Sequence, residues 1–271
     1  METITLNNGV QMPMLGFGTW TVRGKKGEHI LREALDVGYR LFDTAFLYGN
    51  HEIVGKAIRD SGIPRNNIFI TTKLDRQFAS YTKAKAGIAQ AQETLQSDII
   101  DLMLIHEPYA ESLEMYQALE EAYREGTLRA IGISNFNANL YQKLLNHCAI
   151  TPAVNQVENH VYYMQTDLQK VMEPYGTVMQ AWGPLTEGKR PIFTDPILQD
   201  IAKAHDRPVA QIALRYLVQN GIPVIPKSSH RTRMQQNIDI FSFSLSPDEM
   251  ATISLRDEGQ SLFNWFGPDW I

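Results

Sequence analysis

The sequence holds a single cysteine, Cys148, among its 271 residues, so an intramolecular disulfide bond is excluded. No apolar run approaches the ~18 residues that a membrane-spanning helix needs. The N-terminal segment lacks the basic region followed by an apolar one that marks a signal peptide. The absence of disulfides fits a reducing compartment. Together these absences predict a cytoplasmic protein with no membrane partner.

Basic clusters are also sparse. The net charge is −5, and the only locally basic stretch, residues 227–233, is too short for a nucleic-acid footprint. It is long enough to bind one phosphate group. We therefore expect no nucleic-acid partner. Hydrophobic residues make up 44% of the chain and charged residues 20%, which is typical of a globular enzyme with a large core.

A glycine-rich dinucleotide loop is missing as well. An open doubly wound sheet that binds a dinucleotide usually carries Gly-x-Gly-x-x-Gly between a strand and a helix. The nearest match, Gly16-Phe17-Gly18, has no third glycine before a helix. The open sheet is therefore the second choice of fold.

Eight short apolar segments, many of them β-branched, alternate with amphipathic segments. Such segments are typical of strands buried on both faces of a parallel sheet. The predicted strands are 14–19, 39–44, 67–73, 101–106, 128–134, 152–158, 177–182 and 222–228. Eight strand-helix units in 271 residues predict an α/β fold, a closed (β/α)₈ TIM barrel, for which about 250 residues are typical. No linker or repeat divides the chain, so residues 1–271 are expected to form one domain.

Local signals add detail to this prediction. Asn8-Gly9 lies between two apolar runs and predicts an N-terminal β-hairpin, because Asn-Gly favours tight turns with positive φ. Ser246, with Glu249 three residues later, predicts a capped helix start. The predicted helices are 28–38, 81–97, 112–126, 137–147, 207–221 and 246–259.

Four polar residues lie near the ends of three predicted strands: Asp43, Tyr48, Lys73 and His106. The C-terminal strand ends of a barrel form its active-site face. A buried Asp and Lys are expected to pair, and a nearby ammonium lowers the pKa of a phenol. Each residue alone also fits a structural role. Together they predict that Tyr48 donates a proton to a carbonyl oxygen, held by His106, as hydride reaches the carbon.

The motifs around these residues resemble those of the aldo-keto reductase family, and most closely its bacterial members similar to 2,5-diketogluconate reductase. The segments that carry the resemblance are 12–20, 38–58, 69–74, 101–106, 132–137, 153–160, 181–185 and 225–237. The resemblance implies a (β/α)₈ barrel and NADPH-dependent reduction of aldehydes and ketones to alcohols. It assigns Tyr48 as proton donor, tuned by Lys73 and Asp43, with His106 orienting the carbonyl.

The resemblance also implies a cofactor site that prefers NADPH to NADH. Ser134, Asn135 and Gln156 would bind the nicotinamide carboxamide, and Trp182 would stack on the nicotinamide ring. Lys227, Ser228 and Arg233 would bind the 2′-phosphate near a helix start. A solvated basic turn is the alternative for that stretch. The implied cofactor residues are Ser134, Asn135, Gln156, Trp182, Gly183, Leu185, Lys227, Ser228, Ser229, Arg233, Gln236 and Asn237.

The substrate pocket is implied to include Trp20, Phe46, Leu47 and Glu107. Glu107 stands where family members often have tryptophan. If it faces the pocket, it should disfavour anionic substrates and raise the pKa of His106. The C-terminal tail, residues 261–271, is expected to form a loop over the barrel mouth, with packing on the outer helices as the alternative. No metal site is expected.

Other functions remain open on the sequence alone. A barrel lysine beside Asp and Tyr also fits a Schiff-base aldolase that uses Lys73. A non-catalytic nicotinamide-nucleotide-binding subunit is a third possibility. The expected partner is a small carbonyl compound, and we expect a monomer, with a weak dimer as the alternative.

Overall fold

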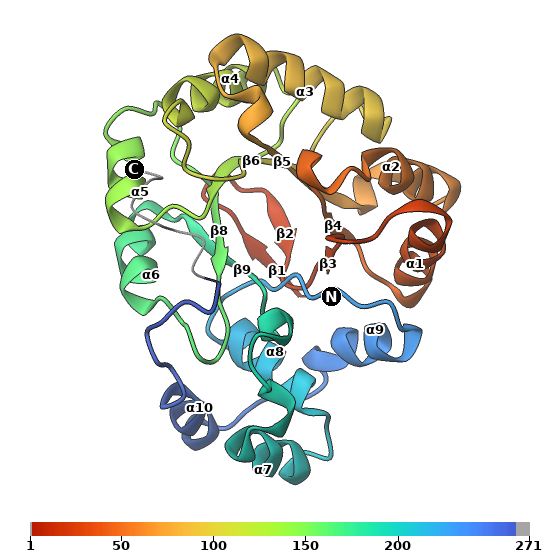
Figure 1. The fold of residues 1–271 in the computed structure, drawn as a ribbon, viewed down its shortest axis with the longest axis vertical. Coiled ribbons are helices and arrows are strands. Elements are labelled where there is room, and N and C mark those ends of the chain that lie inside the picture. Colours follow the sequence, from red (N-terminus) through yellow and green to blue (C-terminus); the bar gives the residue numbers. More distant parts are fainter. Residues whose placement is uncertain (1, 264–271) are drawn as a thin grey trace.

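The computed structural model describes residues 2–263, which form a parallel barrel surrounded by helices (Figure 1). Within this range, neighbouring strands of the parallel sheet follow the order of the sequence. The strands are β3 (Phe17–Gly18), β4 (Leu41–Asp43), β5 (Phe69–Leu74), β6 (Leu102–Ile105), β7 (Ile131–Ser134), β8 (Val154–Glu158) and β9 (Val178–Trp182). Because all run in one direction, their C-terminal ends lie at the same end of the barrel.

Residues around Val224 close the barrel. Val224 forms parallel bridges to Leu15, just before β3, and to Ala181 in β9. The expected eighth strand is therefore present as a pair of bridges. Pro223 and Pro226 flank this contact, and neither has an N–H to extend a strand ladder. The barrel prediction is confirmed with this correction to its eighth strand.

The predicted hairpin consists of β1 (Thr3–Thr5) and β2 (Gln11–Pro13), paired antiparallel. Gly9 in its turn has a φ of 85°, which favours glycine. Figure 1 shows the two strands across the centre of the barrel. Leu6 and Met12, from the hairpin, pack with the barrel residues Leu41, Phe69 and Leu102. The hairpin thus fills the N-terminal end of the barrel and leaves the opposite end for a site.

Ten α-helices within residues 2–263 surround the sheet or pack beside it (Figure 1). They are α1 (Gly24–Val37), α2 (His51–Asp60), α3 (Tyr81–Leu95), α4 (Ser112–Arg124), α5 (Ala138–Leu145), α6 (Thr166–Met172), α7 (Pro196–Ala204), α8 (Val209–Gln219), α9 (Arg231–Ile238) and α10 (Pro247–Ser254). None of the helices in this range is long and apolar enough to cross a membrane.

The six predicted helices are present, and the capping box of Ser246 and Glu249 is formed. Four helices were not among those predicted from apolar periodicity: α2, α6, α7 and α9. Helix α9 explains why, because only Met234 and Asn237 are buried along its polar length. A helix with so few apolar positions has no clear periodic signal.

Candidate active site

Three neighbouring strands bring the predicted catalytic residues together. Asp43 is the last residue of β4, Lys73 the second-to-last of β5, and His106 follows β6 directly. Tyr48 ends a short 3₁₀ turn, Phe46–Tyr48, that follows β4. Asn50 fixes this loop, because its side-chain amide donates hydrogen bonds to backbone oxygens of the loop after β3. Asn50 was not predicted, although a polar residue directly before a helix is a signal for such a role.

Lys73 is the centre of the cluster. Its Nζ lies 2.5 Å from Oδ1 of Asp43, 3.2 Å from the Thr44 carbonyl oxygen and 3.3 Å from Oη of Tyr48. The other Asp43 oxygen accepts a hydrogen bond of 2.7 Å from Nε2 of Gln156. The Lys73 and Asp43 side chains are each 1% exposed. This buried ion pair is therefore well hydrogen-bonded, as a stable buried pair must be.

The electrostatics of Tyr48 differ from the prediction. Burial raises the pKa of Tyr48, and the opposing effect of the Lys73 ammonium is smaller, so the net direction is upward. The expected lowering was wrong because it left out the cost of burying a phenolate. For Lys73, burial lowers the pKa but the neighbouring Asp43 and Tyr48 raise it overall. At neutral pH the site thus holds a charged ammonium beside a protonated phenol.

His106 faces the same end of the barrel. Its ring centroid lies 5.8 Å from that of Tyr48. Burial, together with the charge of Lys73, lowers the pKa of His106 to about 3, so the imidazole is neutral. The expected upward effect of Glu107 was wrong, because burial and Lys73 govern this residue. Among the described residues, Nδ1 of His106 is buried without a hydrogen-bond partner.

Glu107 belongs to a chain of hydrogen bonds beside the cluster. Nδ2 of Asn135 donates to Oε1 of Glu107 at 2.9 Å, and Oδ1 of Asn135 accepts from Nε1 of Trp182 at 2.7 Å. Burial raises the pKa of Glu107 to about 7, although the Asn135 hydrogen bond and the charge of Lys73 act against this. The carboxyl group is therefore close to its titration point at neutral pH.

Two further residues of the predicted nicotinamide group lie between the strand ends. Oγ of Ser134 donates a 2.9 Å hydrogen bond to the carbonyl oxygen of Gln156. Nε2 of Gln156 also donates to Gln180, a buried residue that was not predicted. Gly183 follows β9 with a φ of 61°, and Leu185 packs against the barrel core. The structure thus places these residues at the C-terminal strand ends with the catalytic cluster.

The predicted phosphate residues lie between the closing bridge and α9. Lys227 and Arg233 are exposed, and neither forms an ion pair within residues 2–263. The N-cap of α9, His230, makes no side-chain cap hydrogen bond. Exposed cations beside free N–H groups at a helix start suit a phosphate group. Of the remaining predicted residues, two are buried and two half-buried: Ser228, Asn237, Ser229 and Gln236.

The predicted substrate residues are partly brought together. Trp20 is 41% exposed and its ring lies 5.0 Å from that of Tyr48. Leu47, beside Tyr48, is 58% exposed. Phe46 packs instead against His51 and Phe78, with centroid distances of 4.5 and 4.4 Å. The predicted C-terminal loop over the barrel mouth lies largely in residues 264–271, outside the described residues.

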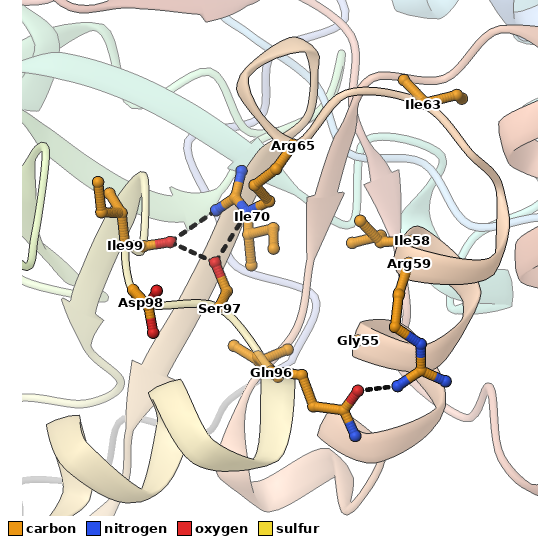
Figure 2. A pocket seen from close by; sticks show the side chains of 11 residues that line it. Gly55, Ile58, Arg59, Ile63, Arg65, Ile70, Gln96, Ser97, Asp98 and Ile99 are labelled. Atoms are coloured by element: carbon orange, nitrogen blue, oxygen red, sulfur yellow. Dashed lines mark hydrogen bonds between the residues drawn. The ribbon is translucent and has the colours of Figure 1, made fainter.

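A separate pocket of about 330 Å³ lies among α2, α3 and the loop that precedes β6 (Figure 2). Arg65, which lines this pocket, has a structural role, because its guanidinium donates hydrogen bonds to Ser97 and to the carbonyl oxygen of Ile99. Arg59 likewise bonds to Gln96. These arginines stabilise loop contacts. No group of three or more metal-ligating side chains is present in the described part of the chain.

Comparisons with known proteins show what the chain is similar to. A family model described as the aldo/keto reductase family matches residues 14–255. The chain is 39% identical to glyoxal reductase of Bacillus subtilis (strain 168), over 96% of this chain and 94% of that protein. It is 37% identical to a 9,11-endoperoxide prostaglandin H2 reductase of Trypanosoma cruzi (strain CL Brener), over 96% and 93% of the two chains.

A solved structure shows the same fold. The crystal structure of MGS-M4, an aldo-keto reductase enzyme from a Medee basin deep-sea metagenome library, superposes with a TM-score of 0.94 at 38% identity. The match covers 96% of this chain and 97% of that one. The chain therefore belongs to the aldo/keto reductase family, oxidoreductases that reduce carbonyl groups with a nicotinamide cofactor.

Proposed function

We propose that this protein reduces aldehydes and ketones to alcohols with NADPH, and that Tyr48 is the proton donor. The observation that carries the proposal is the 3.3 Å contact between Oη of Tyr48 and Nζ of Lys73. It lies at the barrel end where active sites form. NADPH, when bound, supplies the hydride. The phenol O–H proton goes to the carbonyl oxygen, and the phenolate that remains is stabilised by the ammonium.

The neighbouring residues support this role. Asp43 keeps Lys73 charged, since loss of its carboxylate would leave a buried ammonium unpaired. The neutral imidazole of His106 can donate a hydrogen bond to the carbonyl oxygen without competing as an acid. The raised pKa of Tyr48 keeps the proton available at neutral pH. We assign the cofactor to the strand ends near Asn135 and Trp182, with its 2′-phosphate at Lys227 and Arg233.

Small neutral aldehydes are the proposed substrate class. The similarity to a glyoxal reductase points to them. Glu107 supports the same substrate class, because its carboxyl group beside Asn135 becomes anionic above neutral pH and would repel a keto acid. We therefore propose that this protein differs in substrate preference from reductases that take acidic substrates.

The test measures NADPH oxidation with a panel of glyoxals, aromatic aldehydes, keto sugars and keto acids. Tyr48→Phe should lower kcat by about 10²–10⁴-fold, the usual contribution of a general acid. Its affinity for NADPH, measured by fluorescence titration, should be unchanged. Tyr81→Phe is the matched control, because Tyr81 lies on α3 and is partly exposed. A Tyr48→Phe enzyme with wild-type kcat would refute the assignment.

The two alternatives predict different results. A Schiff-base aldolase needs a neutral amine, whereas the pKa of Lys73 is raised and its side chain is 1% exposed. Borohydride trapping of substrate on Lys73 would nevertheless favour the aldolase. A non-catalytic nucleotide-binding subunit would bind NADPH and turn over no carbonyl compound in the panel.

A further inference from the structure

Glu158 is a buried acidic residue that the proposed mechanism does not use. It is the last residue of β8, and its side chain is 2% exposed. Its register partner on β9 is Trp182, so it lies at the same end of the barrel as the catalytic cluster. A carboxyl group in this position needs several donors to offset the loss of water.

The donors to Glu158 come from two parts of the chain. Nε2 of His160 lies 3.0 Å from Oε1. The other two donors belong to the C-terminal segment: the Ser261 hydroxyl donates to Oε2 at 2.5 Å, and the Leu262 N–H donates to Oε1 at 2.8 Å. Glu158 therefore connects a strand end to a segment about a hundred residues later.

This segment continues onto Trp182. The ring of Phe263 lies 4.8 Å from the Trp182 ring at an interplanar angle of 72°, an edge-to-face contact. Phe263 is 7% exposed. A Cβ placed on Gly183 would lie 3.7 Å from the Phe263 ring, so the chain just after β9 passes close to this ring. Phe263 thus packs against the tryptophan that we assign to the cofactor.

Other contacts hold the chain before this point. The N–H of Glu258 donates to the carbonyl oxygen of Tyr162, and Arg190 pairs with Glu258 on the surface. Exposed ion pairs contribute little to stability. Within the described residues, the hydrogen bonds that join Ser261 and Leu262 to the barrel both end on Glu158. Hydrogen bonds to a buried carboxyl group are the stronger kind.

We propose that Glu158 is a positioning residue that holds Ser261–Phe263 against Trp182, so that Phe263 forms one wall of the carbonyl pocket. Loss of Glu158 would free this wall and weaken substrate binding, while the proton donor and its ammonium stay in place. The inference rests on the proposed function in placing the carbonyl pocket beside Trp182. The contact of Glu158 with the segment does not depend on that function.

The first measurement is amide hydrogen exchange at Leu262 by NMR, compared between the wild type and Glu158→Gln. The variant keeps the size of the side chain but replaces one of the two oxygens that accept from Ser261 and Leu262 with an NH₂ group, which cannot accept a hydrogen bond. Exchange at Leu262 should become about tenfold faster, as expected when a hydrogen bond to a charged acceptor is weakened. Amides in β7 and β8 should keep their wild-type rates, which a general loss of stability would change.

The second measurement is a KM-against-kcat comparison on the best aldehyde of the panel. Glu158→Gln and Ser261→Ala should each raise KM by about threefold to tenfold with little change in kcat, and their effects should not add in the double variant, because both break one contact. Glu258→Gln is the matched control and should leave KM and the Leu262 exchange rate unchanged. Ser261→Ala leaves Glu158 intact and tests the contact even if the Glu158 variant folds poorly.

Wild-type Leu262 exchange in Glu158→Gln would overturn the proposal. Additive effects of Glu158→Gln and Ser261→Ala on KM, or an equal effect of Glu258→Gln, would also overturn it. If the wild type turns over no carbonyl compound, the proposed function fails, while the exchange measurement still decides whether Glu158 holds the segment. If turnover is normal and exchange at Leu262 is unaffected, only the role of Glu158 is lost.

Discussion

Nζ of Lys73 lies 2.5 Å from Oδ1 of Asp43, and both side chains are 99% removed from solvent. The two residues come from neighbouring strands, β5 and β4, so the sheet itself sets their separation. A buried ion pair of this kind contributes little net stability compared with apolar residues. Its value here is chemical, because it keeps a positive charge beside the phenol of Tyr48.

Removing the carboxylate should therefore affect both stability and activity. Asp43→Asn leaves Lys73 buried without a counter-charge, which should lower the free energy of unfolding by about 3–5 kcal/mol. It should also lower kcat at least about a hundredfold, because a neutral lysine no longer stabilises the phenolate. Urea unfolding and steady-state kinetics measure the two effects.

Asp101 provides the matched control for Asp43. It is also 1% exposed and pairs with two arginines, Arg65 and Arg129, but it precedes β6 at the opposite end of the barrel. Asp101→Asn should lower stability and leave kcat unchanged. A similar fall in kcat for both variants would show that Asp43 acts through general stability alone.

Arg233 should determine the preference between the two nicotinamide cofactors. Loss of one charged hydrogen bond to the 2′-phosphate should raise KM for NADPH by about tenfold to a hundredfold. KM for NADH should not change in Arg233→Ala, because NADH has no 2′-phosphate. Arg231→Ala, on the same helix and 3.9 Å from Asp36, is the control. Equal KM values for the two cofactors in the wild type would contradict this role.

Glu107 should make the choice of substrate depend on pH. Its pKa of about 7 means that the carboxyl group is largely neutral at pH 6 and charged at pH 8. The ratio of kcat/KM for a keto acid to that for a neutral aldehyde should therefore fall on the order of tenfold over this range. Glu107→Gln should hold the ratio constant at its higher value. If Glu107→Gln and the wild type have the same ratio at pH 8, this role of Glu107 is refuted.

The same residue should affect stability in a defined direction. The pKa of Glu107 rises from 4.5 to about 7 on folding, so the folded state holds the proton more tightly than the unfolded chain. The contribution of protonated Glu107 to the free energy of unfolding is fully present below about pH 4.5 and is lost as the pH rises through 7. At about 1.4 kcal/mol per pKa unit, the free energy of unfolding of the wild type should fall by on the order of 3 kcal/mol over this pH range, relative to that of Glu107→Gln.

Urea unfolding at pH 5 and pH 8 measures this difference. Glu125→Gln is the control, because Glu125 is exposed at the end of α4 and its substitution should not change the pH dependence. A wild type and a Glu107→Gln variant with the same change in unfolding free energy between the two pH values would contradict the raised pKa.

Much of the fold could be read from local patterns in the chain. Alternating apolar and amphipathic segments predict a barrel, and polar residues at successive strand ends predict where its site lies. Asp43, Lys73 and His106 meet because parallel strands bring their C-terminal ends together. Periodicity cannot reveal α9, whose surface is polar, and the prolines beside Val224 reduce the eighth strand to bridges.

Properties that depend on burial or on distant contacts needed the folded chain. The pKa of Tyr48 rises because desolvation outweighs a charge that the sequence places nearby. The environment of Glu107 follows from its contact with Asn135, and that of Glu158 from Ser261 and Leu262. The strands and their order thus follow from the local pattern of residue types along the chain. Solvent exclusion and contacts between distant segments arise only when the barrel packs and its C-terminal segment folds back.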